Sequence, residues 1–339
     1  MSNPASITLL KDGGVFPQQA GDTILRAALR AGKGLTYECN SGGCGGCKFD
    51  LIEGAVEELW PEAPGLTERD RRRGRRLACQ CRAVGDVAIA AATAPEYVPH
   101  IAPKRQQARL AQVREITHDI REFRFVASED ADFLPGQYAM LDLPGLASSR
   151  PYSLANTANG RREWHFQIRR VQHGQGSHVL FDRLAVGNEI GLDGPYGTAH
   201  LRPEAPRDLV CVAGGSGLAP MISVARGADE AGMLEGRRLH FFYGARTPRD
   251  VCGEDMLRQL PGFGSAIEFI PVVSLPHDGG DWTGRTGYVH DELIRVLPRP
   301  LADYEFYFAG PPPMTQALQE LLMLGHKVPF GQIHFDRFF

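Results

Sequence analysis

The sequence lacks any apolar run that approaches the roughly 18 residues of a membrane-spanning helix, which argues against a membrane protein. It also lacks a strong charge of one sign. The formal net charge is -3 and the isoelectric point is near 6.4, so no general affinity for nucleic acid or membrane surfaces is expected. No basic region leads into an apolar run at the N-terminus, so secretion is not indicated and the cytoplasm is the expected compartment. Seven cysteines, an odd count, disfavour a disulfide framework, and 339 residues are enough for two or three domains.

The cysteines that are present form a pattern. Cys39, Cys44 and Cys47 give the spacing Cys-x4-Cys-x2-Cys, and a distant cysteine follows at Cys79 or Cys81. This is the spacing of a plant-type 2Fe-2S cluster. Four of the seven residues from Asn40 to Gly46 are glycine, which lets backbone N–H groups approach the sulfurs. A zinc site would more often pair two short hooks, so the cluster is the favoured interpretation.

The residues around this loop predict a small mixed sheet with one helix. The helix lies between Asp22, as N-cap, and Gly32, as stop signal. Strands are expected at Ile7–Leu10, at Lys48–Ile52 up to a turn at Gly54, and at Val87–Ala90. Three prolines between Ala94 and Arg105 predict a linker, so the first domain ends near residue 95.

Six arginines stand among the eight residues from Arg69 to Arg76, directly before Cys79. A charge run of this kind is often only a solvated face. Its place beside a cluster that hands on electrons instead favours a basic patch that steers an acidic redox protein into contact. Nucleic acid is the weakest interpretation, because the run is short and the whole chain is acidic.

The middle of the chain predicts an all-β barrel, because short strand candidates are separated by Gly, Pro, Asp and Asn. They are Arg109–Ile116, Ile120–Val126, Tyr138–Leu143 and Trp164–Val171. Arg150 and Tyr152 point the same way on a strand, and Ser153 follows. Together with Gly176 and Ser177 they suit a flavin, whose pyrophosphate an arginine pairs with and whose ring a phenol covers.

The last third alternates buried strands with helices, which predicts a parallel sheet. Asp208–Ala213 opens into Gly214–Gly217 and then a helix, an arrangement that directs backbone N–H groups at an anion. Further strands at Leu239–Tyr243, Ile267–Val273 and Tyr304–Phe308 bring the loops at Tyr243–Arg246 and Gly310–Met314 to the same edge.

The order of these motifs resembles the ferredoxin-NADP reductase superfamily with a fused N-terminal plant-type 2Fe-2S ferredoxin. Within it, the segments Trp60–Leu66 and Lys327–Phe339 are similar to toluene 4-monooxygenase-type reductases of bacterial multicomponent oxygenases. The resemblance implies three domains: a β-grasp ferredoxin (α+β) at 1–95, an antiparallel Greek-key β-barrel FAD domain at 104–203, and an α/β parallel-sheet NAD(P)H domain at 207–339.

The resemblance also implies site residues. The cluster ligands would be Cys39, Cys44, Cys47 and Cys79, because Leu-x-Cys-Gln around Cys79 is similar to the family's closing ligand. FAD would be held by Arg150, Tyr152, Ser153, Ile168, Arg169, Val171, Gly176 and Ser177. NADH would lie over Gly215, Ser216, Gly217 and Leu218, near Arg246, Gly310 and Pro311. Phe338 or Phe339 would cover the flavin face or pack in the core.

The implied activity is electron transfer from NADH through FAD and the 2Fe-2S cluster, without a catalytic acid-base pair. The acceptor would be an acidic Rieske-type ferredoxin or the hydroxylase component of a di-iron monooxygenase. One alternative is the reductase of a Rieske aromatic-ring dioxygenase. A second is a redox-sensing protein with poor NADH turnover, supported only by Ala309, which stands where the family usually has cysteine.

Overall fold

The computed structural model describes residues 4–10, 14–278 and 280–338. They divide into two compact units. One contains the chain up to Arg105 together with Asp193–Thr198, and the other contains Gln106–Leu192 and Ala199–Phe338. No helix among the described residues has the length and apolar character needed to cross a membrane.

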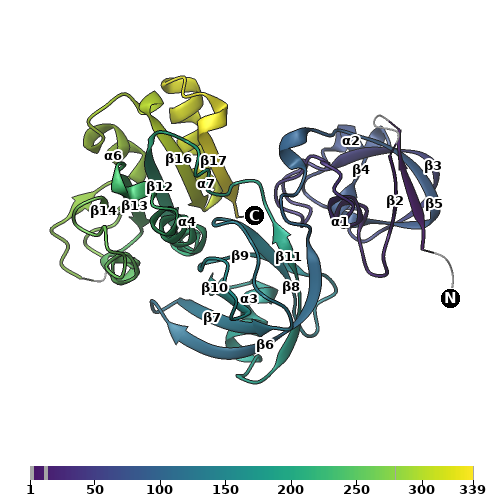
Figure 1. The fold of residues 1–339 in the computed structure, drawn as a ribbon, viewed down its shortest axis with the longest axis horizontal. Coiled ribbons are helices and arrows are strands. Elements are labelled where there is room, and N and C mark those ends of the chain that lie inside the picture. The colour runs from purple at the N-terminus through teal and green to yellow at the C-terminus, as the bar shows by residue number, and fades with distance from the viewer. Residues whose placement is uncertain (1–3, 11–13, 279, 339) are drawn as a thin grey trace. The chain divides into compact units, whose positions relative to one another are not determined.

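The first unit holds a five-stranded mixed sheet in the order β2-β1-β5-β3-β4, with helix α1 packed against it (Figure 1). Strands β1 and β5 run parallel and the other neighbours antiparallel, which is the predicted β-grasp arrangement. The elements are β1 (Ser6–Leu9), β2 (Gly14–Pro17), α1 (Ile24–Arg30), β3 (Lys48–Glu58), α2 (Glu68–Arg72), β4 (Arg76–Leu77) and β5 (Cys81–Ala91).

Two local predictions in this unit are wrong. Thr23, not Asp22, caps α1, because its hydroxyl accepts a hydrogen bond from Arg26 N. Asp22 is instead fully buried and pairs with Arg30 at 3.1 Å. Gly54 does not end a strand. It lies inside the longer β3 at a bulge, with φ +89°, and a Cβ there would come 2.4 Å from Asp86 O.

The second unit begins with a six-stranded antiparallel sheet in the order β10-β7-β6-β11-β8-β9. A bridge between Leu154 and Phe166 links the two ends of this order, so the sheet nearly closes into the predicted barrel. Large side chains such as Phe123, Phe125 and Phe166 fill its interior. The elements are β6 (Lys104–Glu115), β7 (Ile120–Ala127), β8 (Tyr138–Asp142), β9 (Arg150–Ser153), β10 (Glu163–Arg169), α3 (Gln175–Asp182) and β11 (Glu189–Tyr196).

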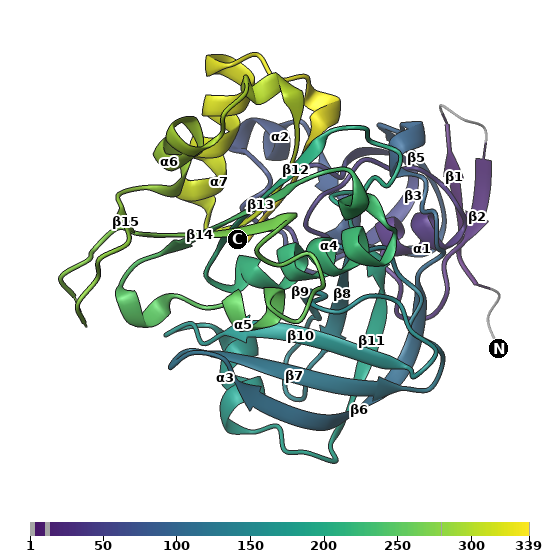
Figure 2. The same ribbon diagram turned by 60° about the vertical axis from the view of Figure 1, so that its left-hand side comes forward.

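The same unit continues into a parallel sheet in the order β15-β14-β13-β12-β16-β17; β12 to β15 are labelled in Figure 2, and β16 and β17 in Figure 1. Alternate strand residues feed two cores: Cys211 and Phe241 pack with α4 on one face, and Val212 and Phe242 pack with α6 on the other. The strands are β12 (Asp208–Gly214), β13 (Leu239–Ala245), β14 (Ile267–Val273), β15 (Arg285–Thr286), β16 (Tyr304–Gly310) and β17 (Ile333–Arg337). The helices are α4 (Leu218–Glu230), α5 (Glu254–Leu257), α6 (Val289–Val296) and α7 (Pro312–Gln319).

Candidate electron-transfer site

The cluster loop between α1 and β3 points its backbone amides at its own cysteine sulfurs. Ser41 N and Cys44 N donate to Cys39 Sγ at 3.5 and 3.3 Å, and Gly46 N donates to Cys44 Sγ at 3.3 Å. A hydrogen bond from the Cys44 thiol, with these amides, lowers the pKa of Cys39 to about 5. Amides directed at thiolates in this way stabilise negative charge on sulfur.

The fourth cysteine of this group is Cys79, which follows β4 in a short 3-10 helix. Its buried thiol hydrogen-bonds to Cys47 and lies within electrostatic reach of Cys39 and Cys44, all of which help to raise the pKa of Cys79. Cys81 opens β5 instead, and burial raises its pKa to about 12. The geometry therefore gathers the predicted set Cys39, Cys44, Cys47 and Cys79.

Four converging thiols fit a cluster that takes four thiolates. A second feature fits as well: Asn40 is buried in the loop at φ +52°, and both polar atoms of its side chain are without a partner within the described chain. A buried amide without a partner is costly unless a further group satisfies it.

The flavin candidates meet where β9 approaches the start of α3. A Cβ on Gly176 would come 2.5 Å from the Tyr152 hydroxyl and 3.3 Å from Arg150 Cγ, so a larger residue would force these side chains to move. Ser177 lies in the first turn of α3, where its hydroxyl accepts from Val171 N at 3.1 Å. Burial raises the pKa of the Tyr152 phenol. An arginine, a phenol and the N-terminus of an eight-residue helix fit the phosphates and ring of FAD.

Three flavin candidates that are close in sequence lie in different environments: Ile168, Arg169 and Val171. The Ile168 side chain lies in the barrel core, and Val171 is exposed two residues after β10 ends. Arg169 Nε pairs with Asp119 Oδ2 at 2.6 Å, and its Nη1 lies 3.4 Å from the position a Cβ of Gly215 would take. The Arg169 guanidinium thus lies beside the glycine loop of the parallel sheet.

That glycine loop is packed tightly against the carboxyl end of β16 and the start of α7. A Cβ on Gly217 would lie 2.0 Å from Ala309 O, and one on Gly214 would lie 2.7 Å from Met314 Sδ. Tyr243, at the end of β13, donates to Gly215 O at 3.4 Å. The structure therefore confirms that the three predicted loops meet at the carboxyl edge of the sheet. Leu218 opens α4 there, Ser216 is half-buried, Gly310 is buried, and Pro311 and Arg246 are exposed.

The C-terminal aromatic candidates are only partly described. Phe338 packs against the core that contains α4, and its N–H donates to Gly310 O at 3.3 Å. Phe339 lies outside the described residues. Core packing is thus the observed environment of Phe338.

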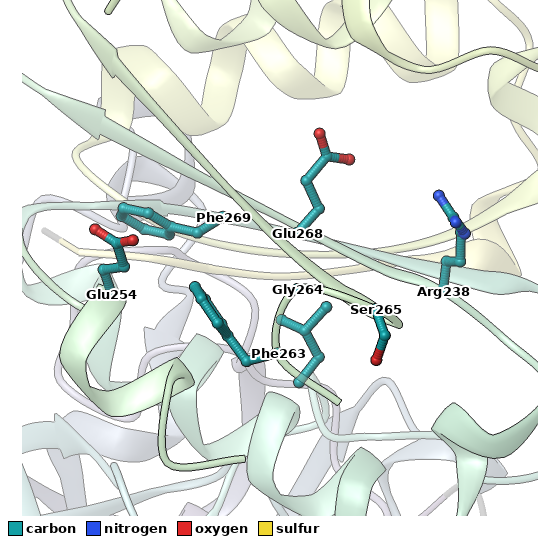
Figure 3. Close-up of a pocket in the computed structure, with 8 residues that line it drawn as sticks. Arg238, Glu254, Phe263, Gly264, Ser265, Glu268 and Phe269 are labelled. Atoms are coloured by element: carbon teal, nitrogen blue, oxygen red, sulfur yellow. The ribbon is translucent and has the colours of Figure 1, made fainter. Parts of the chain in front are cut away.

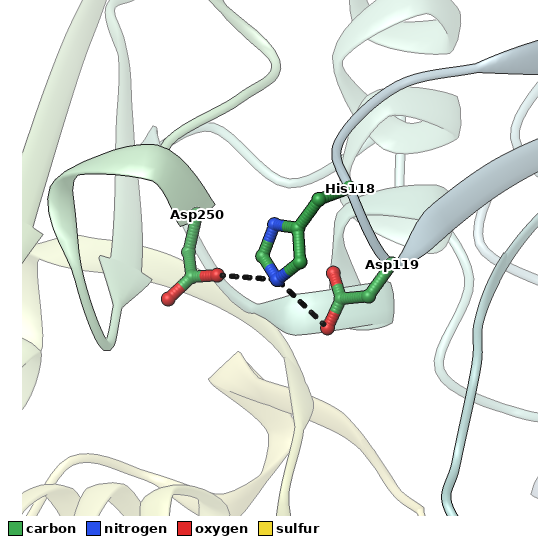
Figure 4. A group of neighbouring side chains, drawn as sticks. All are labelled: His118, Asp119 and Asp250. Atoms are coloured by element: carbon green, nitrogen blue, oxygen red, sulfur yellow. Dashed lines mark ion pairs between the residues drawn. The ribbon is translucent and has the colours of Figure 1, made fainter. Parts of the chain in front are cut away.

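His118, Asp119 and Asp250 form a further group, shown in Figure 4. His118 Nε2 lies 3.9 Å from Asp119 Oδ2 and 3.7 Å from Asp250 Oδ1. Both carboxylates already have donors, Arg169 for Asp119 and Thr247 N for Asp250 at 2.8 Å. The group therefore links the barrel to the parallel-sheet domain without needing a metal ion.

A surface pocket in the parallel-sheet domain lies between Arg238, Glu254, Phe263 and Glu268 (Figure 3). Arg238 precedes β13 and Glu268 stands near the start of β14, so the pocket lies at the amino-terminal ends of these strands. The glycine loops follow the carboxyl ends, where such sheets bind ligands, and the pocket is separate from them.

Two features of the site were absent from the predicted set. Asp119, which pairs with Arg169, stands fifty positions from it in a loop, and Cys252 donates to the Tyr243 hydroxyl at 3.2 Å. No local spacing in the sequence predicts either contact. The available signal is the short turn in which the Thr117 hydroxyl donates to Asp119 Oδ1.

A cysteine cluster site, a flavin site and a dinucleotide loop in one chain define an iron-sulfur flavoprotein oxidoreductase. Three family matches agree with this class. Residues 7–84 match the 2Fe-2S iron-sulfur cluster binding domain, residues 107–201 the oxidoreductase FAD-binding domain, and residues 211–320 the oxidoreductase NAD-binding domain. The predicted cofactors FAD, 2Fe-2S cluster and NADH are thereby confirmed.

Relatives cover nearly the whole chain. Ferredoxin–NAD(P)+ reductase CarAd of Metapseudomonas resinovorans is 42% identical over 94% of this chain and 95% of its own. The ferredoxin–NAD+ reductase component of the alkene monooxygenase system of Xanthobacter autotrophicus is 36% identical over 97% and 99%. The solved ferredoxin reductase in carbazole 1,9a-dioxygenase is 38% identical, with a TM-score of 0.91 over 98% of both chains. The chain belongs to the ferredoxin–NAD(P)+ reductase family with an N-terminal 2Fe-2S domain, and its relatives are reductase components of oxygenase systems.

Proposed function

We propose that this chain is the NADH-dependent reductase component of a bacterial multicomponent di-iron monooxygenase. Its acceptor is an acidic redox protein, either a Rieske-type ferredoxin or the hydroxylase component. The observation that carries the proposal is the presence of all three sites in one chain, with four cysteines gathered at Cys39, Cys44, Cys47 and Cys79. The alkene monooxygenase relative and the xylene/toluene monooxygenase component XylA of Pseudomonas putida, 33% identical over 99% of this chain, support the oxygenase class.

When bound, FAD accepts a hydride from NADH and releases electrons singly, and the cluster carries single electrons. The chain's own residues bind and orient these groups. Arg150 and the start of α3 hold the flavin phosphates, and Tyr152 borders its ring. The loop Gly215–Leu218 presents backbone N–H groups to the dinucleotide phosphates, with the Arg169 guanidinium beside it. The same three-part division predicted from the sequence, 1–95, 104–203 and 207–339, is part of this proposal.

A second candidate is the reductase of a Rieske aromatic-ring dioxygenase. It is favoured by the 42% identity to CarAd and the 38% identity to the reductase in carbazole 1,9a-dioxygenase. Both candidates use the same internal electron path, so the partner oxygenase distinguishes them. NADH-driven oxygenation by a reconstituted di-iron hydroxylase, compared with that by a Rieske dioxygenase, separates the two. Faster turnover with the dioxygenase would overturn the first assignment.

Coenzyme preference is proposed as NADH over NADPH. Arg246 is exposed after β13, where a 2′-phosphate would find a cation, so NADPH use is the competing possibility. The ratio of kcat/KM for the two coenzymes decides it, and a ratio that favours NADPH would contradict the proposal.

The experiment that tests the relay is an anaerobic NADH titration of the purified protein, followed by visible absorption, with iron and sulfide assayed on the same sample. We expect bleaching of flavin and cluster bands together, with about two irons per chain. A flavin that stays oxidised would contradict the proposal and favour a redox-sensing protein in which Ala309 slows NADH turnover. Zinc in place of iron would contradict the assignment of the cluster.

A further inference from the structure

The six arginines before Cys79 divide into two sets in the structure. Arg71 belongs to the domain's own framework, because its Nη2 donates to Ala63 O at 2.9 Å. Arg75 reaches Asp50 and Asp70, and Arg76 pairs with Glu58 at 2.9 Å. These three side chains are occupied in holding the ferredoxin fold together.

The other three arginines face solvent on one side of α2. Arg69, Arg72 and Arg73 follow the spacing i, i+3, i+4, which places them on one helix face. All three are exposed, and Arg72 forms a surface pair with Glu68 at 3.3 Å, in which both side chains are more than 70% exposed. Such a pair is worth little in water, so its cation is available to a partner.

Trp60, a large apolar side chain, lies next to the segment that hydrogen-bonds to α2. Trp60 is 44% exposed, yet its ring edge packs on the cluster loop, since a Cβ on Gly42 would lie 3.2 Å from Trp60 Cε3. Gly65 N donates to Gly42 O at 2.9 Å, which fixes the same segment to the loop. Arg71 Nε approaches Pro61 O at 3.4 Å and so links α2 to this segment.

The cluster loop itself is most open at one ligand. Cys44 is half-buried, whereas Cys39, Cys47 and Cys79 are buried. Cys44 therefore gives the most direct route for an electron from the cluster to the surface. It lies in the same loop whose Gly42 packs against Trp60.

We propose that Trp60, Arg69, Arg72 and Arg73 form the docking face for the electron acceptor, an acidic iron-sulfur protein. This inference rests on the proposed function. The three arginines steer a partner with carboxylates around its own redox centre, and Trp60 supplies the buried contact that keeps it in place. Charge complementarity selects the partner, because a basic protein would be repelled at this face.

The test uses the full-length protein with FAD and cluster, a purified Rieske ferredoxin of acidic isoelectric point, and basic cytochrome c as the opposite probe. R72E/R73E is expected to raise KM for the ferredoxin roughly tenfold or more at low salt and to flatten its salt dependence. KM for cytochrome c stays unchanged or falls. W60A is expected to raise KM for the ferredoxin roughly tenfold. In W60F, which keeps an aromatic ring at this position, KM is expected to return most of the way to that of the unsubstituted protein.

The matched control is R161E. Arg161 is 76% exposed and pairs with a nearby glutamate, Glu163, as Arg72 is 74% exposed and pairs with Glu68. It reverses one charge of the same kind in the barrel, outside the ferredoxin unit, and we expect KM for the ferredoxin to change less than about twofold. Equal effects of R161E and R72E/R73E would overturn the proposal, as would unchanged KM in both R72E/R73E and W60A.

Ferricyanide reduction and NADH bleaching of the cluster separate this proposal from the proposed function. If the unsubstituted protein fails to bleach its cluster with NADH, the relay is wrong. If it bleaches and only the ferredoxin KM is unaffected by the substitutions, the docking face is wrong. Should W60A lose iron, R72E/R73E, which leaves Trp60 in place against Gly42, decides the matter.

Discussion

Two glycine-rich loops carry the two ends of the proposed electron path, and the most constrained glycines of each are required for different reasons. In the cluster loop, Gly42 and Gly45 have φ of +93° and +75°, a conformation that side chains rarely adopt. In the dinucleotide loop, Gly217 has φ of -60°, which any residue adopts, but a Cβ would lie 2.0 Å from Ala309 O. Gly42 and Gly45 are needed first for backbone direction, and Gly217 is needed for space alone. The contrast holds for these positions and not for every glycine, since a Cβ on Gly45 would also lie 2.4 Å from Gly65 O and Gly215 has φ of +57°.

This difference follows from what each loop holds. Sulfur ligands are supplied by the chain itself, so the cluster loop curls until its amides face its own Cys39 and Cys44. The dinucleotide arrives from solution, so its loop presents backbone N–H groups outward, and the carboxyl end of β16 at Ala309 supports it from behind. Substitutions in the two loops should therefore fail in different ways.

The largest expected effect comes from removing a cluster ligand. Cys79→Ser replaces a buried thiol that hydrogen-bonds to Cys47 and lies within electrostatic reach of Cys39 and Cys44, and we expect the protein to lose its iron and its reduction of protein acceptors. Ferricyanide reduction through the flavin remains, because the dinucleotide loop is untouched. Iron content and visible absorption measure the first effect, and NADH-ferricyanide assays the second.

Cys81→Ser is the matched control for that substitution. Cys81 is as buried as Cys79 but opens β5, and it is absent from the hydrogen-bonded sulfur group. We expect about two irons per chain in Cys81→Ser. Iron lost from Cys81→Ser and kept in Cys79→Ser would show that the fourth ligand has been assigned to the wrong cysteine.

A smaller but still large effect is expected in the dinucleotide loop. Gly217→Ala forces the loop away from Ala309, at an overpacking cost of about 1–3 kcal/mol. If that cost falls on the bound state, KM for NADH rises on the order of tenfold to a hundredfold. Iron content stays normal, because the cluster loop is independent of this packing.

Gly236→Ala provides the comparison within the same domain. Gly236 has φ of -135° and nothing within 4 Å of the added Cβ, so KM for NADH and thermal stability should match those of the unsubstituted protein. Steady-state kinetics and thermal melting of the two variants test the contrast. A Gly217→Ala variant with unchanged KM would mean that the loop relaxes without cost.

The two loops also differ in how far the sequence predicts them. The cluster loop is contiguous, so the spacing of Cys39, Cys44 and Cys47 was sufficient to infer it. The packing of Gly217 on Ala309 joins residues about ninety positions apart, and the pairing of Asp119 with Arg169 joins residues fifty apart, so no local pattern reports them. The sequence did predict that the three loops meet, because the carboxyl ends of parallel strands share an edge.

Two strands were not predicted, because their sequences contain turn-forming or polar residues although pairing with neighbouring strands holds them in the sheets. Strand β11 was missed because Gly191, Gly194 and Pro195 indicate a turn, yet it lies between β6 and β8 within the barrel. Strand β17 was missed because it is short and polar. It is held at the sheet edge by pairing with β16 and by stacking of Phe335 on Phe308 at 5.2 Å.

The smallest of the expected effects concerns two adjacent arginines at the end of β10. Arg169 was predicted to hold FAD, but its guanidinium lies beside Gly215 and is anchored by Asp119 at 2.6 Å. Arg170 forms an equivalent pair with Asp182 at 2.9 Å. If Arg169 faces the dinucleotide phosphates, Arg169→Gln removes one charge-assisted contact. KM for NADH should then rise about tenfold. The effect is smaller than for a fully buried charge-assisted hydrogen bond, because the Arg169 side chain is partly solvated.

Arg170→Gln removes a similar charge one residue away and should leave KM for NADH within about twofold, because surface ion pairs contribute little. Rising salt should weaken NADH binding to the unsubstituted protein and to Arg170→Gln, and less so to Arg169→Gln. The FAD content of purified Arg169→Gln tests the alternative, that Arg169 binds the flavin. If FAD is lost while KM for NADH is unchanged in the flavin-loaded fraction, Arg169 serves the flavin, as the sequence predicted, and the dinucleotide loop acts without a cation from the barrel.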